Sequence, residues 1–500
     1  MTRRAIITAL AASAATAAII VAEATAPRAF AETGAPRAWQ TPDVLSRIRQ
    51  EGLERSKVQA LFTTLTDQFG PRLAGTPAYK QSAEWARDRM REFGLSDPAL
   101  EPWQFGRGWV LDKIVVEMIE PRYMPLIGYA EAWSAPTGGD IVASPVVVAG
   151  RSAADVAAMK DRLKGAIVLT QPDAAFIKED RPQPSTSETP VRIGQPPPVA
   201  PRGNAADTRT VAQTLRDAGA GVILKTSEGE HGTVFVLGRD QGDNAQPSVV
   251  LAGELYNMIS RMVKAGLPVK LRVNVQSHFT SDDLNSYNVV GEIPGSDPQL
   301  KSEIVLLGAH LDSWHTGTGA SDNADGVAVV LETVRILKAL GLQPKRTIRF
   351  GLWGGEEEGL LGSKAYATKH LTGDANKEAR DRTFVYLNMD PATGPIYGWY
   401  MQDSEPAKAI FDKWLEPLKD LGMRKNVIAG IGNTDHLSFR AAGVPGFNPI
   451  QEYKDYDVRM HHTNVDLYER VREQDLKQNA VVMAWFAWQA ATTAERIPRP

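Results

Sequence analysis

Apolar residues recur along the C-terminal half of the chain in two alternating patterns. Short continuous apolar runs, such as those at 303–307 and 383–387, are typical of strands buried on both faces. Longer stretches with helical spacing lie between or after them, as at 323–342 and 472–495. This alternation predicts an α/β fold in which a mixed, mostly parallel sheet has helices on both faces.

Upstream of this half, the apolar runs become shorter. Residues 128–273 carry brief strand-like runs, among them KGAIVLTQP, AGVILKT, TVFVLG and PSVVLAG. They predict a β-rich insert that divides one catalytic domain into a first part, 32–127, and a main part, 274–500. Within the insert, the Pro-rich stretch 173–204 predicts a long projecting loop, whose role the sequence leaves open.

Helical spacing also marks the start of the first catalytic part. Two amphipathic helices are predicted within 41–70 and 76–95, and each ends at a glycine, Gly70 or Gly94. The second helix follows Thr76, a residue type that favours the position before a first helical turn. These helices supply an apolar face for packing against the sheet.

The first 31 residues have the features of an export signal. The basic stretch MTRR precedes an alanine-rich apolar run, and Ala29-Phe30-Ala31 forms a small-x-small cleavage site. Arg3-Arg4 is compatible with the twin-arginine route as well as the Sec route. The sequence therefore predicts a secreted or periplasmic protein, with no membrane span in its mature form.

Composition narrows the chemistry. The 500-residue chain has a net charge of -3, which argues against a nucleic-acid partner because such partners usually need a basic face. It contains no cysteine, which excludes disulfides, thiol nucleophiles and thiolate metal ligands. A metal site in this chain must therefore use His, Asp and Glu.

Polar residues of those three types follow the predicted strands. The carboxyl ends of parallel strands meet at one edge of a sheet, so we expect these side chains to lie close together and to form one functional site. The candidates are His310, Asp312, Asp322, Glu356, Glu357, Glu358, Asp390, His461 and His462.

This set fits a centre of two zinc ions. Zinc binds imidazole and carboxylate groups, and two zinc ions close together need one shared carboxylate. Asp322 can bridge, with His310 and Asp390 on one ion and Glu357 and His462 on the other. Glu356 is then free to act as a general base, and Asp312 can orient the His310 imidazole.

Several motifs then show a family resemblance. HLDSW, the DNxxG after it, WGGEEEGLLGS, YLNMD, TDHLSF and HHTNVD occur in order. They resemble co-catalytic zinc exopeptidases, a group that includes bacterial secreted aminopeptidases, glutamate carboxypeptidase and carboxypeptidase Q, of which carboxypeptidase Q is the nearest. The insert resembles a protease-associated domain. The resemblance spans most of the chain after the signal.

Carried over by motif, the resemblance implies the same ligands and the same base. It implies hydrolysis of peptides or dipeptides by zinc-activated water with Glu356 as the base, and it allows a homodimer. Three glutamates in WGGEEEG leave room for a slip of one position, although the usual spacing favours Glu356 and Glu357. His461 stands where many relatives have tyrosine and is a candidate donor to the oxyanion. His436, in TDHLSF, has no settled role.

Two other functions remain open at this point. A glutaminyl-cyclase-like transferase shares the catalytic fold, and a non-catalytic peptide-binding protein would carry the same insert. The complete ligand set argues against both. The sequence leaves open side-chain specificity, the metal used in vivo, oligomeric state, and the choice between aminopeptidase, dipeptidase and carboxypeptidase.

Overall fold

The computed structural model describes residues 43–182, 205–390 and 393–500. The predicted signal at 1–31 and most of the Pro-rich loop at 173–204 lie outside the described residues. Among the residues that are described, no helix has both the length and the apolar character needed to cross a bilayer.

A seven-stranded sheet forms the centre of the catalytic part. Its four central strands run parallel to one another, and the strands at both edges are antiparallel to their neighbours. This confirms the predicted mixed sheet with a parallel centre. In spatial order the strands are β1 (Ser96–Gln104), β11 (Asn285–Ile293), β13 (Thr347–Trp353), β12 (Ile304–His310), β14 (Thr383–Asn388), β16 (Gly446–Glu452) and β15 (Thr393–Tyr400).

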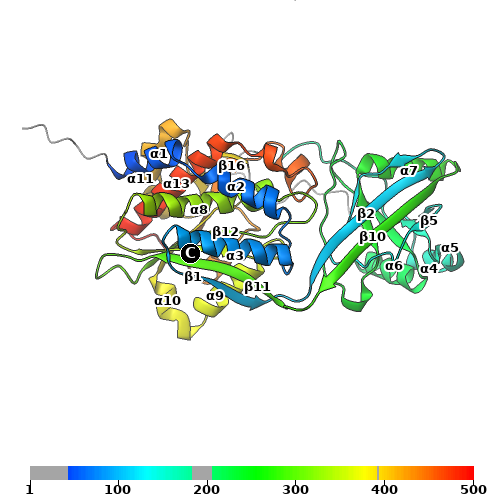
Figure 1. Ribbon diagram of the computed structural model, residues 1–500, viewed down its shortest axis with the longest axis horizontal. Helices are drawn as coiled ribbons and strands as arrows, with labels where there is room; N and C mark the ends of the chain where they lie inside the picture. Colours follow the sequence, from blue (N-terminus) through cyan, green and yellow to red (C-terminus); the bar gives the residue numbers. More distant parts are fainter. Residues whose placement is uncertain (1–42, 183–204, 391–392) are drawn as a thin grey trace, which may run out of the picture. The chain divides into compact units, whose positions relative to one another are not determined.

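Helices cover both faces of this sheet, as the sequence pattern predicts. In Figure 1, α8 and α13 lie above strands β1 and β11, and α9 and α10 lie below them. The first face packs into one large apolar core with α1 (Val44–Glu54), α2 (Val58–Thr63), α3 (Pro77–Glu92), α8 (Asp325–Ala339), α11 (Glu405–Leu415) and α13 (Glu473–Thr492). The second face packs with α9 (Leu361–His370) and α12 (His436–Ala441), and α10 (Lys377–Arg382) lies nearby.

The insert has two sheets and a core of its own. The first sheet has the order β3 (Met124–Pro125), β2 (Gly108–Glu120), β10 (Lys270–Thr280) and β5 (Ile141–Ala143). The second has the order β4 (Gly128–Ala130), β9 (Ser248–Leu251), β8 (Val222–Thr226), β7 (Ile167–Leu169) and β6 (Val146–Val147). Its helices are α4 (Ala153–Ala157), α5 (Lys160–Leu163), α6 (Ala205–Asp217) and α7 (Gly253–Lys264).

Strand pairing bears on where the insert begins. β2 pairs with β10 over almost its whole length and not with the catalytic sheet. The predicted division at 127 and 273 stays a prediction, and this pairing favours limits nearer 107 and 281. One predicted strand is wrong, because TVFVLG makes only single bridges, from Phe235 to Thr463 and from Gly238 to Ala132. This segment therefore bridges to two separate parts of the chain, at Ala132 and at Thr463, instead of extending a sheet.

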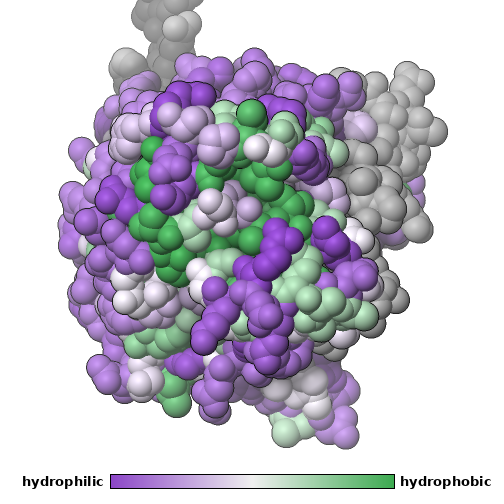
Figure 2. All heavy atoms as spheres, turned by 90° about the vertical axis from the view of Figure 1, so that its right-hand side faces the viewer, coloured by the Kyte–Doolittle hydropathy of each residue, from purple (hydrophilic) through white to green (hydrophobic). Residues whose placement is uncertain are grey.

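The outer face of the insert carries apolar side chains framed by hydrophilic ones (Figure 2). Among the described residues, Tyr123, Val142 and Leu267 are the large apolar side chains of this part that are about half exposed or more. The core of the insert therefore does not take up all of its apolar side chains.

The centre of the catalytic sheet leaves no room for a side chain at Gly308, in β12. A Cβ atom there would lie 2.6 Å from the Gly351 carbonyl oxygen and 2.7 Å from Trp353 Nε1. We expect Gly308→Ala to lower the free energy of unfolding by about 1–3 kcal/mol, because backbone atoms cannot move away cheaply. Denaturant unfolding measures this. Gly432→Ala, with no atom within 4 Å of the new Cβ, is the control that should stay near wild type.

Candidate metal centre

The carboxyl ends of three neighbouring strands bring the predicted site residues together. β12 ends at His310, β13 is followed by Glu356 and Glu357, and β14 is followed by Asp390. Asp322 comes from the irregular turn Ala320–Ala324 that leads into α8. The remaining imidazoles, His461 and His462, follow the short helical segment Tyr456–Met460.

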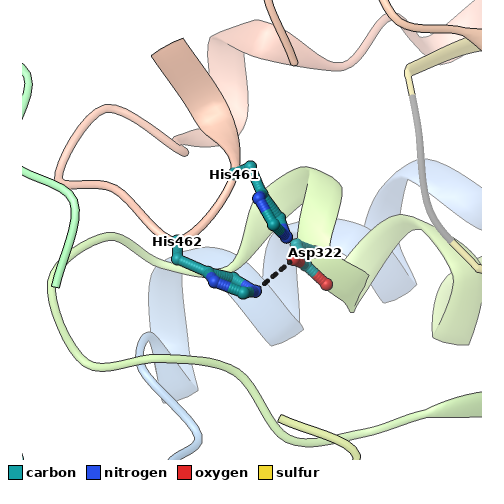
Figure 3. A group of neighbouring side chains, drawn as sticks. All are labelled: Asp322, His461 and His462. Atoms are coloured by element: carbon teal, nitrogen blue, oxygen red, sulfur yellow. Dashed lines mark ion pairs between the residues drawn. The ribbon is translucent and has the colours of Figure 1, made fainter. Parts of the chain in front are cut away.

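The Asp322 carboxylate lies between two groups of donor atoms. Its Oδ1 is 3.1 Å from His310 Nε2, which is also 3.2 Å from Asp390 Oδ1. Its Oδ2 is 3.4 Å from His462 Nε2, which is also 2.8 Å from Glu357 Oε2. Figure 3 shows the imidazoles of His461 and His462 directed toward this carboxylate from another segment of the chain. One carboxylate is thus shared by two nitrogen-and-oxygen sets.

The surroundings of these groups fit divalent cations. Burial, followed by the nearby Asp322 charge, raises the pKa of Glu357 to about 7. Burial likewise raises the pKa values of Asp390 and Glu356. Buried carboxylates this close repel one another unless positive charge compensates them. Imidazole and carboxylate donors without sulfur are the set that catalytic zinc prefers, and Co²⁺ and Mn²⁺ accept the same ligands.

Contact with His462 distinguishes the three consecutive glutamates. Glu357 lies against the His462 imidazole, whereas both carboxylate oxygens of Glu358 are buried without a hydrogen-bond partner among the described residues. Among the described residues, Glu356 makes no ion pair with the imidazole of His310 or with that of His462. This arrangement agrees with Glu357 as the ligand and with Glu356 as the free carboxylate.

Asp312 contacts two parts of the site, the His310 imidazole and the backbone of the turn that carries Glu356 and Glu357. Its backbone carbonyl oxygen lies 3.1 Å from His310 Nδ1, closer than its own carboxylate, at 3.7 Å. The carboxylate instead accepts hydrogen bonds from the backbone N–H groups of Glu356 and Glu357. Asp312 therefore holds the glutamate turn in place as well as the imidazole that the sequence assigned to it.

His461 lies beside the candidate metal ligands, and its imidazole is disfavoured from taking up a proton. Its ring centroid is 3.7 Å from that of His462, and it can place a nitrogen within 4.8 Å of an Asp322 oxygen. Burial, followed by the nearby His462, lowers the pKa of His461 to about 3. It is therefore neutral near pH 7, a form that can donate one hydrogen bond or bind a metal.

Three residues that sequence reasoning missed support this centre. The Tyr456 hydroxyl donates to Asp322 Oδ2 at 3.3 Å. The Asp466 carboxylate accepts from the backbone N–H groups of Ser321 and Asp322. Arg72 is fully buried, and among the described residues its guanidinium donates only to backbone carbonyls, those of Leu65, Gly70, Leu311, Thr318 and Gly319. Asp466 had a local signal, because it lies within the quoted HHTNVD motif.

Comparison with known proteins agrees with this geometry. Residues 288–487 match the model of peptidase family M28. Human carboxypeptidase Q is 27% identical over 450 residues, which cover 90% of this chain and 88% of that protein. A peptidase M28 precursor from Shewanella amazonensis has a TM-score of 0.70 at 27% identity, covering 91% of this chain and 98% of the other. A zinc aminopeptidase from Bacillus subtilis shares the fold at 20% identity and a TM-score of 0.59, over 88% and 96% of the two chains.

His436, by contrast, belongs to a separate buried pocket. Its Nε2 lies 2.7 Å from Gln402 Nε2 and 3.2 Å from the Ile431 carbonyl oxygen, and its Nδ1 has no hydrogen-bond partner among the described residues. Burial and the Arg440 charge lower its pKa from 6.5 to about 3. The neutral imidazole thus serves the packing of α12.

This depressed pKa predicts a pH dependence of stability. Between pH 6.5 and about 3 the unfolded chain binds a proton at His436 that the folded chain excludes. The free energy of unfolding should therefore decrease as the pH is lowered below 6.5, and this residue contributes up to about 1.4 kcal/mol per pH unit to the decrease. Denaturant unfolding of wild type and His436→Gln from pH 7.5 to 4 measures the difference. Parallel pH profiles for the two proteins would contradict the prediction.

Proposed function

Because residues 288–487 place this chain in peptidase family M28, we propose that it is an exported exopeptidase with two zinc ions. The observation that carries the proposal is the Asp322 carboxylate, shared between the His310–Asp390 pair and the His462–Glu357 pair. A single-ion site would have no use for that arrangement. We also propose that the insert is a protease-associated domain and that the export signal is removed at residue 31. A homodimer stays a prediction.

Each ligand has a distinct place in this proposal. His310 and Asp390 would hold one ion, Glu357 and His462 would hold the other, and Asp322 would contribute to both sites. When bound, the two ions lower the pKa of water and polarise the peptide carbonyl. Asp312 and Asp466 orient the segments that carry these ligands through hydrogen bonds to their backbone N–H groups.

Glu356 moves the proton in this scheme. Its carboxylate accepts a proton from the attacking water as the C–O bond forms, and then passes that proton to the amine of the leaving fragment as the peptide C–N bond breaks. Burial raises the pKa of Glu356 above its ordinary value, which suits a group that must both accept and release a proton near neutral pH. The neutral His461 imidazole is a candidate hydrogen-bond donor to the oxyanion.

A restricted cleft is the feature that would make such a centre an exopeptidase. Phe235, from the insert, has its ring centroid 5.5 Å from that of His462, so the insert reaches the ligands themselves. A side chain of the insert this close to a proposed ligand supports cleavage at a chain end rather than within a long peptide. Human carboxypeptidase Q is similar in sequence over most of this chain, and a zinc aminopeptidase from Bacillus subtilis has the same fold. These likenesses leave the choice of terminus open.

Replacing the proposed base separates catalysis from metal binding. We expect Glu356→Gln to keep both zinc ions, because Glu356 is not a ligand, and to lower kcat about 10²- to 10⁴-fold. Elemental analysis and peptide hydrolysis measure the two effects. Glu358→Gln is the matched control within the same turn and should keep most activity. Undiminished cleavage by Glu356→Gln with both ions bound would refute this mechanism, and a larger loss in Glu358→Gln would shift the base by two positions.

A substrate panel identifies the reaction itself. Free dipeptides, amino-blocked peptides, carboxy-blocked peptides and an N-terminal glutaminyl peptide would be incubated with and without a chelator. We expect hydrolysis that needs a free terminus and stops with the chelator. Dependence on a free amine marks an aminopeptidase, and activity confined to unblocked dipeptides marks a dipeptidase. A pyroglutamyl product would support the cyclase alternative, and no turnover of any substrate would support a binding protein.

A further inference from the structure

One loop of the catalytic part, residues 453–466, carries both Tyr456 and His462 and is held from outside. We call it the ligand loop. Two described segments of the insert contact it, 180–181 and 234–236. These segments and the loop are more than 200 residues apart in the sequence. The ligand loop supplies His462, one ligand of the proposed metal centre, so whatever holds the loop also affects the ion site that contains His462.

The first contact is an ion pair that is largely removed from solvent. Arg181 Nε lies 3.0 and 2.8 Å from the two Asp457 carboxylate oxygens, and the Arg181 backbone N–H donates to the same group at 2.8 Å. The Asp457 side chain is 5% exposed and that of Arg181 20%. Burial disfavours the charged carboxylate, yet Arg181 keeps the pKa of Asp457 below its ordinary value. A planar guanidinium in this geometry fixes direction as well as distance.

The same guanidinium also packs over aromatic rings of the loop. Arg181 Cζ lies 4.7 Å from the ring centroid of Tyr453 and 5.6 Å from that of Tyr456. Its neighbour Asp180 accepts hydrogen bonds from the backbone N–H groups of Asp455 and Val458, at 2.7 and 3.1 Å. The insert therefore fixes both the start of the Tyr456–Met460 segment and the Tyr456 side chain.

The second contact reaches His462 directly. The Val236 N–H donates to the His462 carbonyl oxygen at 3.2 Å, and the Val234 N–H donates to Asn464 Oδ1 at 2.6 Å. Phe235 pairs with Thr463 and lays its ring beside the His462 imidazole. His462 has a φ of 58°, in the left-handed region that non-glycine residues adopt only when their surroundings hold them there.

We propose that Arg181 is a positioning residue of the insert for the His462 half of the metal centre. It acts through Asp457 and Tyr456, whose hydroxyl donates to Asp322 Oδ2, the oxygen that faces His462. Among the described residues, no side chain of the insert forms an ion pair with His310 or Asp390, which come from the end of β12 and from the position two residues after β14. The insert thus acts on one of two adjacent ion sites. This inference rests on the proposed function for the identity of the ion, but not for the contacts.

Arg181→Ala tests the inference, and Arg107→Ala is its matched control. Arg107 also forms a two-pronged ion pair, with Asp240, and packs over an aromatic ring, that of Phe279, but makes no contact with the ligand loop among the described residues. Arg181→Lys keeps the charge while losing the fork. Phe235→Ala removes the ring contact with His462 and leaves the Arg181–Asp457 ion pair and the backbone hydrogen bonds in place, so it serves if Arg181→Ala fails to fold.

Two measurements report on the full chain. Peptide-level hydrogen exchange of the metal-free protein reports on residues 453–466. Competition with a chelator reports the affinities of the first and second zinc equivalents. We expect Arg181→Ala to speed exchange in 453–466 and to weaken one zinc equivalent about 10-fold while the other stays at wild-type affinity. Arg181→Lys should lie between Ala and wild type, and Arg107→Ala should match wild type in both measurements.

The outcomes separate this inference from the proposed function. Unchanged exchange in 453–466 for both Arg181→Ala and Phe235→Ala overturns the inference, whatever the metal content. Equal weakening of both zinc equivalents also overturns it, because a general loss of structure would act on both. A wild-type protein that binds fewer than two zinc ions overturns the proposed function, and faster exchange in 453–466 would then still support the role of Arg181.

Discussion

The shared Asp322 carboxylate is the interaction on which the rest of the site depends. Its two oxygens face imidazoles that come from chain segments about 150 residues apart, His310 at the end of a strand and His462 in a loop. Further carboxylates crowd the same volume with little exposure to water. Such a cluster repels itself unless positive charge compensates it, and the two zinc ions that we propose would supply that charge. The repulsion that destabilises the cluster without metal therefore favours the binding of divalent cations.

Much of the surrounding structure serves to hold backbone segments rather than ligands. Arg72 gathers carbonyl oxygens from both sides of the loop that precedes Asp322. Asp312 and Asp466 each accept backbone N–H groups at a turn that carries a ligand. A buried polar group leaves its partners unsatisfied if it is removed, so these three side chains tie the geometry of the turns to the folded state. The insert does the same for the ligand loop, from a distant part of the sequence.

Strands and helices of the catalytic part could be predicted because their signals are local. The apolar run at 303–307 is buried as β12, and the helical pattern at 472–495 forms α13. TVFVLG had an equally apolar pattern, yet Phe235 and Val236 pair with the ligand loop instead of with a sheet. The long pairing of β2 with β10 was also beyond the pattern, because either strand alone is compatible with either sheet. Partner choice between strands depends on contacts that no window of residues contains.

Residue types and strand ends were sufficient to name the candidate ligands, since parallel strands necessarily deliver the residues that follow them to one edge. The sequence by itself determined which groups are available, that they are nitrogen and oxygen donors, and that sulfur chemistry is absent. Only the tertiary structure decided that Glu357 rather than Glu358 meets His462, that the Asp312 carboxylate turns to a backbone, and that Arg181 reaches Asp457, 276 residues away. Those choices follow from how the catalytic sheet, the two sheets of the insert and their loops pack, and packing is set by contacts between residues that are distant along the chain.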